Sequence, residues 1–133
     1  MPKQTADMMI LLIEDDPFFA GLAAKLLAPA TVVIARDGTE GLGLLERAAF
    51  DLAIVDLLMP VKDGLSTTVD LRKRDVKIPI LAISAGGNIG AEGDLLRIAL
   101  AIGATATLTK PFGRTELMAK VEECLSAREP VSA

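Results

Sequence analysis

FDLAIVDLLMPVKDG, residues 50–64, is the stretch on which both the fold and the chemistry of this chain depend. It begins with an apolar strand pattern, Leu52 to Val55, that ends directly in the carboxylate of Asp56 and continues into a loop that reaches Gly64. Burying a carboxylate is costly unless a charge or a hydrogen bond compensates for the lost water. We therefore expect a compensating group from elsewhere in the chain to lie beside Asp56.

Polar side chains follow three other strand patterns at the point where each pattern gives way to a loop. They are Glu14, Asp15 and Asp16 after residues 8–13, Ser84 after residues 80–83, and Lys110 after residues 105–109. The carboxyl ends of parallel strands meet at one edge of an open sheet, and ligands bind at that edge. We expect these side chains to gather around Asp56.

Apolar or β-branched runs alternate with helical patterns along the chain, and the connections between them are short. The expected strands are residues 8–13, 31–35, 52–55, 80–83 and 105–109. The expected helices are residues 17–27, 39–49, 64–75, 95–102 and 113–127. Asp16 and Thr115 are the expected N-caps of the first and last helices, and Gly103 is expected to end the fourth helix. This alternation predicts an α/β fold, a three-layer sandwich around a five-stranded parallel sheet. We expect one domain over residues 1–133, with a core at about 8–127, flexible ends and a mobile glycine-rich segment at 85–93.

The composition argues against several classes of function. The net charge is −4 and the chain has no basic run, so we expect no binding to nucleic acid. It contains no His, the usual catalytic base and zinc ligand. Its one Cys, Cys124, rules out an internal disulfide and is expected to be a half-buried structural thiol. The run 8–13 is too short for a signal peptide or a membrane span, so we expect a cytoplasmic protein.

The strand-end motifs together resemble those of the response-regulator receiver domain of two-component signalling, over about residues 8–127. The matching pieces, in order along the chain, are ILLIEDDP, FDLAIVDLLMPVKDG, ILAIS and LTKPF. Each piece alone is weak evidence, but all of them stand at strand ends with the expected spacing. The resemblance implies a flavodoxin-like sheet with strand order 2-1-3-4-5 and a cis peptide bond at Lys110-Pro111.

The resemblance also implies the roles of the site residues. Asp56 would be the nucleophile that accepts a phosphoryl group, while Lys110 would pair with one phosphoryl oxygen and Ser84 would donate to another. The cofactor would be Mg²⁺, which prefers carboxylate oxygens, waters and phosphate. Its implied ligands are Asp15 and Asp56 directly, Glu14 partly through water, and the backbone carbonyl of Leu58.

Two departures from the family pattern bear on signalling. Most receivers carry Tyr or Phe three residues before the lysine, where this chain has Thr107. The usual aromatic switch is therefore absent. An attacking water could be oriented by a polar side chain two residues after Asp56 or two residues after Ser84. This chain has Leu58 and Gly86 at these positions, and neither offers such a side chain. We therefore expect slow self-dephosphorylation.

Plainer interpretations remain open for single residues. The acids of residues 14–16 could favour the dipole of the following helix without any ligand. Lys110 could be an ordinary surface lysine, and Ser84 a strand-end cap. No comparable interpretation explains Asp56, which closes an apolar strand.

We expect a phosphoryl-accepting switch of a two-component system or phosphorelay, and not a turnover enzyme. It would take phosphate from a histidine kinase or a histidine phosphotransfer protein and act on an unknown downstream protein. Because Thr107 replaces the switch aromatic, the alternative is an interaction module that works without phosphorylation. A phosphatase with an aspartyl nucleophile would need a second carboxylate where Leu58 stands, and a flavin protein would need a hydroxyl-rich loop after the first strand.

We expect a stand-alone receiver with no output domain, although the ending REPVSA is equally compatible with a piece of a longer regulator. Residues 95–102 are apolar almost all round, which is more than one buried stripe requires. Either a partner surface, including that of a homodimer, or close packing against the neighbouring helix would explain this.

Overall fold

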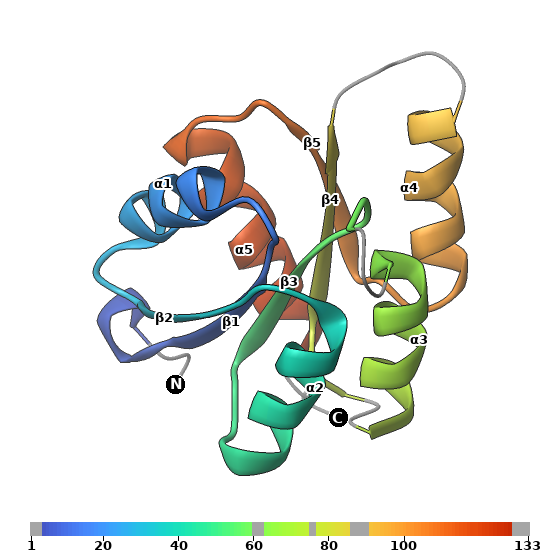
Figure 1. The fold of residues 1–133 in the computed structure, drawn as a ribbon. Coiled ribbons are helices and arrows are strands. Elements are labelled where there is room, and N and C mark those ends of the chain that lie inside the picture. Colours follow the sequence, from blue (N-terminus) through green and yellow to red (C-terminus); the bar gives the residue numbers. More distant parts are fainter. Residues whose placement is uncertain (1–3, 60–62, 75–76, 86–90, 129–133) are drawn as a thin grey trace, which may run out of the picture.

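The strands all run parallel in one sheet of order β2-β1-β3-β4-β5 (Figure 1). Their bounds are Met9–Ile13 for β1, Thr31–Ala35 for β2, Leu52–Asp56 for β3, Ile80–Ala85 for β4 and Ala106–Lys110 for β5. The structure is a computed structural model and describes residues 4–59, 63–74, 77–85 and 91–128. The predicted fold class and strand order are confirmed.

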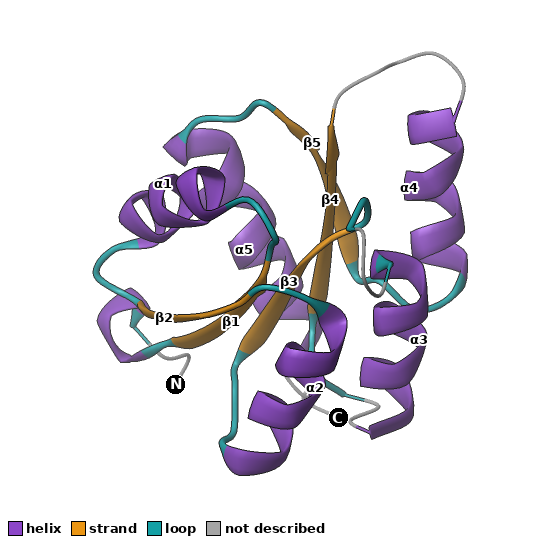
Figure 2. Ribbon diagram, viewed as in Figure 1, coloured by secondary structure: helices purple, strands orange, loops and turns teal. Residues whose placement is uncertain are grey.

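Helices cover both faces of the sheet (Figure 2). Their bounds are Pro17–Leu27 for α1, Gly38–Arg47 for α2, Gly64–Arg74 for α3, Ala91–Ala101 for α4 and Arg114–Arg128 for α5, preceded by a short 3-10 turn, Thr5–Asp7. Buried residues of α1 and α5 pack on one face, and those of α2, α3 and α4 on the other. The sandwich therefore has the three layers that the alternation of elements predicted.

The central strands are apolar throughout because both of their faces are buried. Leu11 and Ile13 of β1 pack toward α2, α3 and α4, while Ile10 and Leu12 pack toward α1 and α5. Neighbouring side chains on a strand point to opposite faces, so a strand between two helical layers needs a continuous apolar run. β1 pairs with β3 over Ile13 and Val55, which brings the ends of these two strands side by side.

Short polar side chains fix the starts of two helices. Asp16 caps α1, where its carboxylate accepts from the Phe18 N–H at 3.0 Å, as predicted. Asp37 caps α2 in the same way and accepts from the Glu40 N–H at 2.8 Å. The predicted cap Thr115 is wrong, because α5 already begins at Arg114 and Thr115 lies inside its first turn.

The α4 helix differs most from its predicted bounds. It begins at Ala91 rather than at residue 95, so Gly93, predicted to lie in a loop, is helical. Residues 86–90 of the predicted mobile segment lie outside the described part of the chain. The helix ends at Ala101, followed by Gly103 with a φ of 126°, a conformation that glycine adopts without strain.

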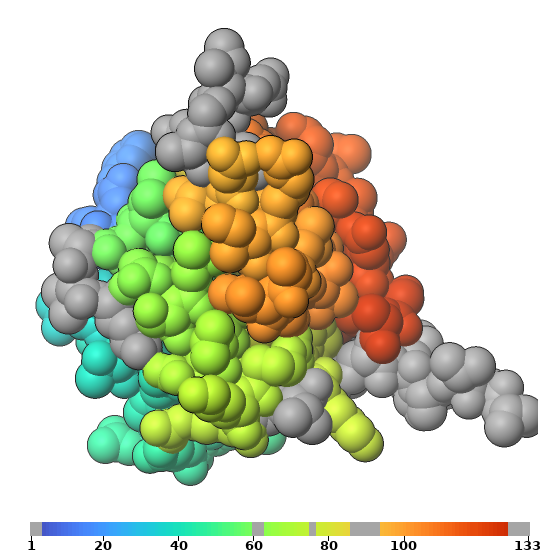
Figure 3. All heavy atoms as spheres, turned by 90° about the vertical axis from the view of Figure 1, so that its right-hand side faces the viewer, coloured from blue at the N-terminus to red at the C-terminus, as the bar shows by residue number. Residues whose placement is uncertain are grey.

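The apolar surplus of α4 is divided between core and surface. Leu95, Leu96 and Ala99 pack against the core, whereas Ile98 and Leu100 are 45% and 46% exposed. Figure 3 shows α4 beside α3 on this face of the molecule. Packing against the core thus accounts for part of the pattern, and the exposed part is the surface to which the prediction of a partner applies.

Candidate functional site

Three carboxylates meet at the carboxyl edge of the sheet. Glu14 and Asp15 directly follow β1, and Asp56 is the last residue of β3, so the pairing of these two strands brings the acids together. Each offers a carboxylate oxygen within 4.8 Å of the others. Glu14 and Asp56 are only 1% and 4% exposed, whereas Asp15 is exposed. The cluster is a shallow site with a buried floor and one open side.

Backbone groups hold the two buried carboxylates in place. The Leu58 N–H donates to Asp56 Oδ1 at 3.1 Å, and the Asp16 N–H donates to Glu14 Oε2 at 3.1 Å. Leu57, directly after β3, lies against the start of α3, where the Gly64 N–H donates to the Leu57 carbonyl at 3.1 Å. A Cβ at Gly64 would collide with the backbone of Asp56 and Leu57, so only glycine permits this approach.

Lys110 enters the acidic cluster from the edge strand β5. Its Nζ lies 2.7 Å from Glu14 Oε1 and 3.7 Å from Asp56 Oδ2, and its side chain is 19% exposed. It therefore reaches across β4 instead of pointing into solvent, and the surface-lysine interpretation is wrong. The Lys110-Pro111 peptide bond is cis, as the resemblance implied. The hydrogen bond to Glu14 is new, since the sequence suggested only a pairing with phosphate.

Burial strongly affects the two inner carboxylates. Loss of solvent raises the pKa of Glu14 to about 7, although the hydrogen bond from Lys110 acts in the opposite direction. Burial likewise raises the pKa of Asp56, while its bonds with Glu14 and Leu58 and the charge of Lys110 oppose the rise. The single ammonium does not fully compensate the acids, so a further cation would stabilise their charged forms.

Ser84 lies in β4, next to β3, and close in the chain to Ile83, the pairing partner of Asp56. Its side chain is fully buried, and its Oγ has no hydrogen-bond partner among the described residues. A buried hydroxyl without a partner is costly and uncommon in folded proteins. The strand-end cap interpretation therefore finds no support in the described residues, and a ligand oxygen at the site would satisfy this donor.

Two aromatic rings beside Lys110 were not predicted from the sequence. The Phe19 ring centroid lies 4.0 Å from Lys110 Nζ, and the Phe112 ring meets the Phe19 ring edge to face at 5.6 Å between centroids. Phe112 stands in the quoted LTKPF motif, but no spacing rule places Phe19, on α1, near the lysine. Thr107, at the position of the missing aromatic, is half-buried in β5.

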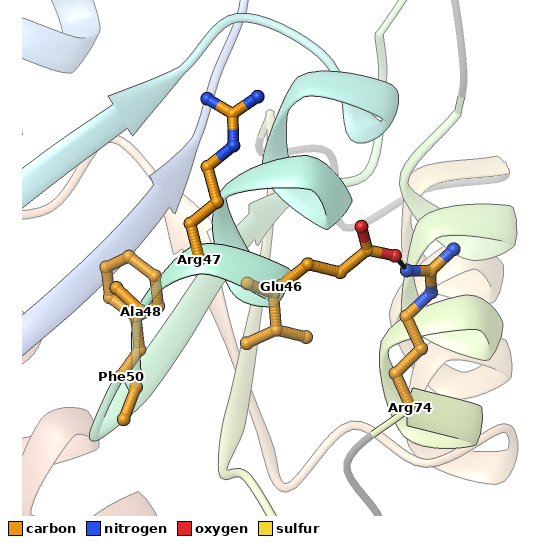
Figure 4. A pocket seen from close by; sticks show the side chains of 7 residues that line it. Glu46, Arg47, Ala48, Phe50 and Arg74 are labelled. Atoms are coloured by element: carbon orange, nitrogen blue, oxygen red, sulfur yellow. Dashed lines mark ion pairs between the residues drawn. The ribbon is translucent and has the colours of Figure 1, made fainter.

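A separate pocket lies at the opposite, amino-terminal edge of the sheet (Figure 4). It is lined by the end of α2, by Phe50 just before β3 and by Arg74 at the end of α3. Glu46 and Arg74 form an ion pair across it and thereby link α2 to α3. Both side chains are largely exposed, so the pair is weakly stabilising and the pocket has no buried polar group that would select a ligand.

The fold and the site define a doubly wound α/β protein whose carboxyl edge combines an acidic cluster, a buried hydroxyl and an inward-pointing lysine. The chain belongs to the response regulator receiver domain family, which matches residues 10–122. It is thus a receiver domain of the kind found in two-component response regulators, and the resemblance seen in the sequence is confirmed. None of the described helices has the length and apolar composition to cross a membrane.

The similar regulatory proteins are longer than this chain. The transcription factor SKN7 of Saccharomyces cerevisiae is 35% identical over 124 residues, which are 92% of this chain and 19% of that protein. The transcriptional regulatory protein CpxR of Klebsiella pneumoniae is 34% identical over 119 residues, 87% of this chain and 48% of that protein. The chain thus spans about half or less of these relatives.

A solved structure of similar size shows the same fold. The chemotaxis protein CheY4 of Vibrio cholerae matches with a TM-score of 0.79 and 28% identity, over 89% of this chain and 98% of that one. A receiver domain of a Francisella response regulator matches with a TM-score of 0.78 and 26% identity, over 92% and 100% of the two chains.

Proposed function

We propose that this receiver is a phosphoryl-accepting signalling switch and that Asp56 is the residue that becomes phosphorylated. The observation that supports this most directly is the position of Lys110, whose side chain is only 19% exposed and whose Nζ lies 3.7 Å from Asp56 Oδ2. A fixed cation next to a nucleophilic carboxylate stabilises the charge of a phosphoryl group in transfer.

The transfer step uses an oxygen of Asp56. This oxygen forms a bond to phosphorus while the bond between phosphorus and the donor breaks, and the donor group leaves with the electron pair. For a small acyl phosphate the leaving group is a carboxylate, and for a phosphohistidine it is an imidazole nitrogen that then takes up a proton. The product is an acyl phosphate on Asp56, with no net redox change.

The residues present fit a divalent cation. Glu14, Asp15 and Asp56 offer hard oxygens within 4.8 Å of one another, and burial raises the pKa of Glu14 to about 7, a penalty that a cation would offset. When bound, Mg²⁺ would neutralise charge on the phosphoryl oxygens. Asp15 and Asp56 would hold it directly and Glu14 partly through water, with the Leu58 carbonyl as the remaining protein ligand.

Two further side chains would bind the phosphoryl group itself. Lys110 would exchange its hydrogen bond with Glu14 for one with a phosphoryl oxygen, since the single charge of the Asp56 carboxylate is replaced by about two charges on the phosphoryl oxygens. Ser84 would donate its hydroxyl, which has no partner among the described residues, to another oxygen. Both groups stabilise transferred charge and need no proton transfer of their own.

The proposed partners follow from this chemistry. The donor would be a histidine kinase or a histidine phosphotransfer protein, and the phosphorylated receiver would act by binding a downstream protein. The chain would not turn over an external substrate, so it is not an enzyme in that sense. The net charge of −4 argues against a nucleic acid as its direct partner.

Incubation with a small acyl phosphate and Mg²⁺, followed by intact-mass measurement, tests the proposal. We expect an adduct of about 80 Da that is absent with Asp56→Asn and without the metal. Asp16→Asn is the matched control, because Asn also caps a helix and Asp16 donates no side chain to the cluster. Failure of the wild type to form the adduct under these conditions would contradict the proposal.

The alternative function is an interaction module that works without phosphorylation. Thr107 favours it, because a small half-buried side chain replaces the ring that reports phosphorylation in most receivers. Binding to a partner captured from the source cell distinguishes the two functions. Equal affinity of wild type, with and without the phosphodonor, and of Asp56→Asn would support the module over the switch.

A further inference from the structure

The ammonium of Lys110 is enclosed by groups from three different elements. Glu14 Oε1, after β1, lies 2.7 Å from Nζ, and Asp56 Oδ2, at the end of β3, lies 3.7 Å away. The Phe19 ring of α1 lies 4.0 Å away, measured to its centroid. The acids supply negative charge, and the ring presents the π face that attracts a cation.

A lysine needs such constraints to act at a defined point. Its charge sits at the end of a flexible four-carbon stem, and its three donors have no fixed geometry. The hydrogen bond to Glu14 and the longer ion pair with Asp56 still leave the stem some freedom to rotate. The Phe19 ring adds a third contact, so that the ammonium stays within reach of both Glu14 and Asp56.

The Phe19 ring is itself held in place. It meets the Phe112 ring at 5.6 Å between centroids and an interplanar angle of 87°, an edge-to-face geometry that aromatic pairs prefer. Both rings are half-buried and pack against the core layer that α1 and α5 share. Phe112 follows Lys110 by two positions, so the ring pair joins α1 to the segment that carries the lysine.

We propose that Phe19 is a positioning residue of this receiver: its ring face holds the Lys110 ammonium at the point from which the lysine meets a phosphoryl group on Asp56. This inference rests on the proposed function, because the position matters only if phosphate arrives there. In this assignment Phe19 neither binds the phosphoryl group nor offers a metal ligand, and it acts through Lys110.

A simpler role for Phe19 would be to fill apolar space between α1 and the sheet. The two roles differ in what they require. Space filling needs volume, and Phe19→Leu retains most of it. Positioning needs the electron-rich ring face, which Phe19→Tyr retains, Phe19→Leu loses, and fluorinated phenylalanines weaken with little change in size.

The experiment measures the rate of adduct formation from a small acyl phosphate and Mg²⁺ by intact mass. We expect Phe19→Leu to react about threefold to tenfold more slowly than wild type, and Phe19→Tyr to restore most of the rate. Site-specific incorporation of fluorinated phenylalanines at residue 19 should slow the reaction progressively with the number of fluorines. Phe18→Leu is the matched control, because Phe18 is the neighbouring residue of the same type and is 80% exposed.

A second readout, independent of phosphorylation, tests the contact itself. Protons of the Lys110 side chain next to the amine should resonate upfield in the wild type because of the ring current of Phe19, and Phe19→Leu should remove this shift. A normal shift in the wild type would overturn the inference. So would an unchanged rate across the fluorinated series.

Failure of the inference can be told apart from failure of the proposed function. If the wild type forms the adduct but the rate is insensitive to the ring, only the role of Phe19 is wrong. If the wild type forms no adduct, the proposed function is wrong, and the positioning role is wrong with it.

Discussion

Lys110 Nζ donates to Glu14 Oε1 at 2.7 Å, while its contact with Asp56 Oδ2 is longer, at 3.7 Å. The lysine of the edge strand is thus bonded to the acid that follows β1 rather than to the proposed acceptor. Glu14 is 1% exposed, so water does little to screen this pair. Because Glu14 is buried and hydrogen-bonded to Lys110, we expect the stability of the protein to depend on the protonation of Glu14, and therefore on pH.

The metal-free protein should lose stability as pH rises from about 4.5 to about 7. The pKa of Glu14 is raised from 4.5 to about 7, so over this range the folded state keeps a proton that the unfolded state has released. The raised pKa of Asp56 acts in the same direction. Urea unfolding in the presence of a chelator, at several pH values across this window, measures the effect.

Glu14→Gln is the control for this pH dependence. It removes the titrating group and retains an oxygen that can accept from Lys110. We expect the difference in unfolding free energy between wild type and variant to change with pH across the window and to be constant above it. A difference that stays constant throughout would show that Glu14 titrates at its ordinary pKa.

Loss of a carboxylate from the cluster should weaken Mg²⁺ binding. We expect Asp15→Asn to lower the affinity by about tenfold or more, because a charged oxygen near the ion is lost. Asp15 is exposed, so this substitution should hardly change the stability of the metal-free protein. Calorimetric titration with Mg²⁺ measures the affinity, and Asp16→Asn should bind as wild type does. Equal affinity of Asp15→Asn would remove this residue from the ligand set.

The fold could be predicted because each level of the sequence pattern points to the same arrangement. Apolar runs of strand length alternate with helical patterns along the chain. Runs such as residues 10–13 are apolar on both faces of the strand, as a sheet that lies between two helical layers requires. The polar residues at the strand ends then meet by topology alone. Asp56 and Lys110 come together for this reason, although they lie far apart in the sequence.

Contacts that depend on the direction of a side chain could not be predicted. Arg72 of α3 donates to the Ile78 carbonyl at 2.6 Å and to the Gly103 carbonyl at 2.5 Å, and so connects the start of β4 to the end of α4. Periodicity places Arg72 on a helix but does not indicate these partners. The contact between Phe19 and Lys110 depends on rotamers in the same way.

Cys124 should be unreactive in the folded protein. It was expected to be half-buried, but it is fully buried on α5, and burial raises its pKa to about 12. Since the thiolate is the reactive form, alkylation near neutral pH should require unfolding. We expect labelling by iodoacetamide to be negligible in buffer and complete in denaturing urea, as measured by intact mass. Rapid labelling of the native protein would contradict the burial of this thiol.

Leu58→Asn should shorten the lifetime of the phosphorylated form. Leu58 is 48% exposed beside Asp56, so a polar amide at this position can orient a water toward the phosphoryl group. We expect the decay to accelerate by roughly threefold to tenfold, less than a full general base would provide. Intact mass after removal of the phosphodonor follows the decay, and Leu58→Met is the apolar control. Equal half-lives for Leu58→Asn and Leu58→Met would rule out Leu58 as a cause of slow dephosphorylation. Gly86, the other residue to which slow dephosphorylation is ascribed, lies outside the described part of the chain.

Ser84→Ala should affect stability and phosphorylation in opposite ways. The buried Oγ of Ser84 has no partner among the described residues, so its removal eliminates an unsatisfied donor. We expect the unfolding free energy of the metal-free protein to stay unchanged or to rise by about 1 kcal/mol. The rate of adduct formation should fall by about tenfold or more, because one hydrogen bond to the transferred group is lost.

Thr68→Val provides the matched comparison for Ser84→Ala. Thr68 is also fully buried, but its hydroxyl donates to the Gly64 carbonyl at 2.7 Å. Replacing it with the isosteric valine should cost about 1 kcal/mol of unfolding free energy and leave the phosphorylation rate unchanged. Both variants are measured by urea unfolding and by the intact-mass assay. Together these measurements distinguish a hydroxyl that stabilises the fold from one that binds a ligand. If Ser84→Ala were destabilised as Thr68→Val is, with its rate intact, the hydroxyl of Ser84 would have a structural role and none in phosphoryl binding.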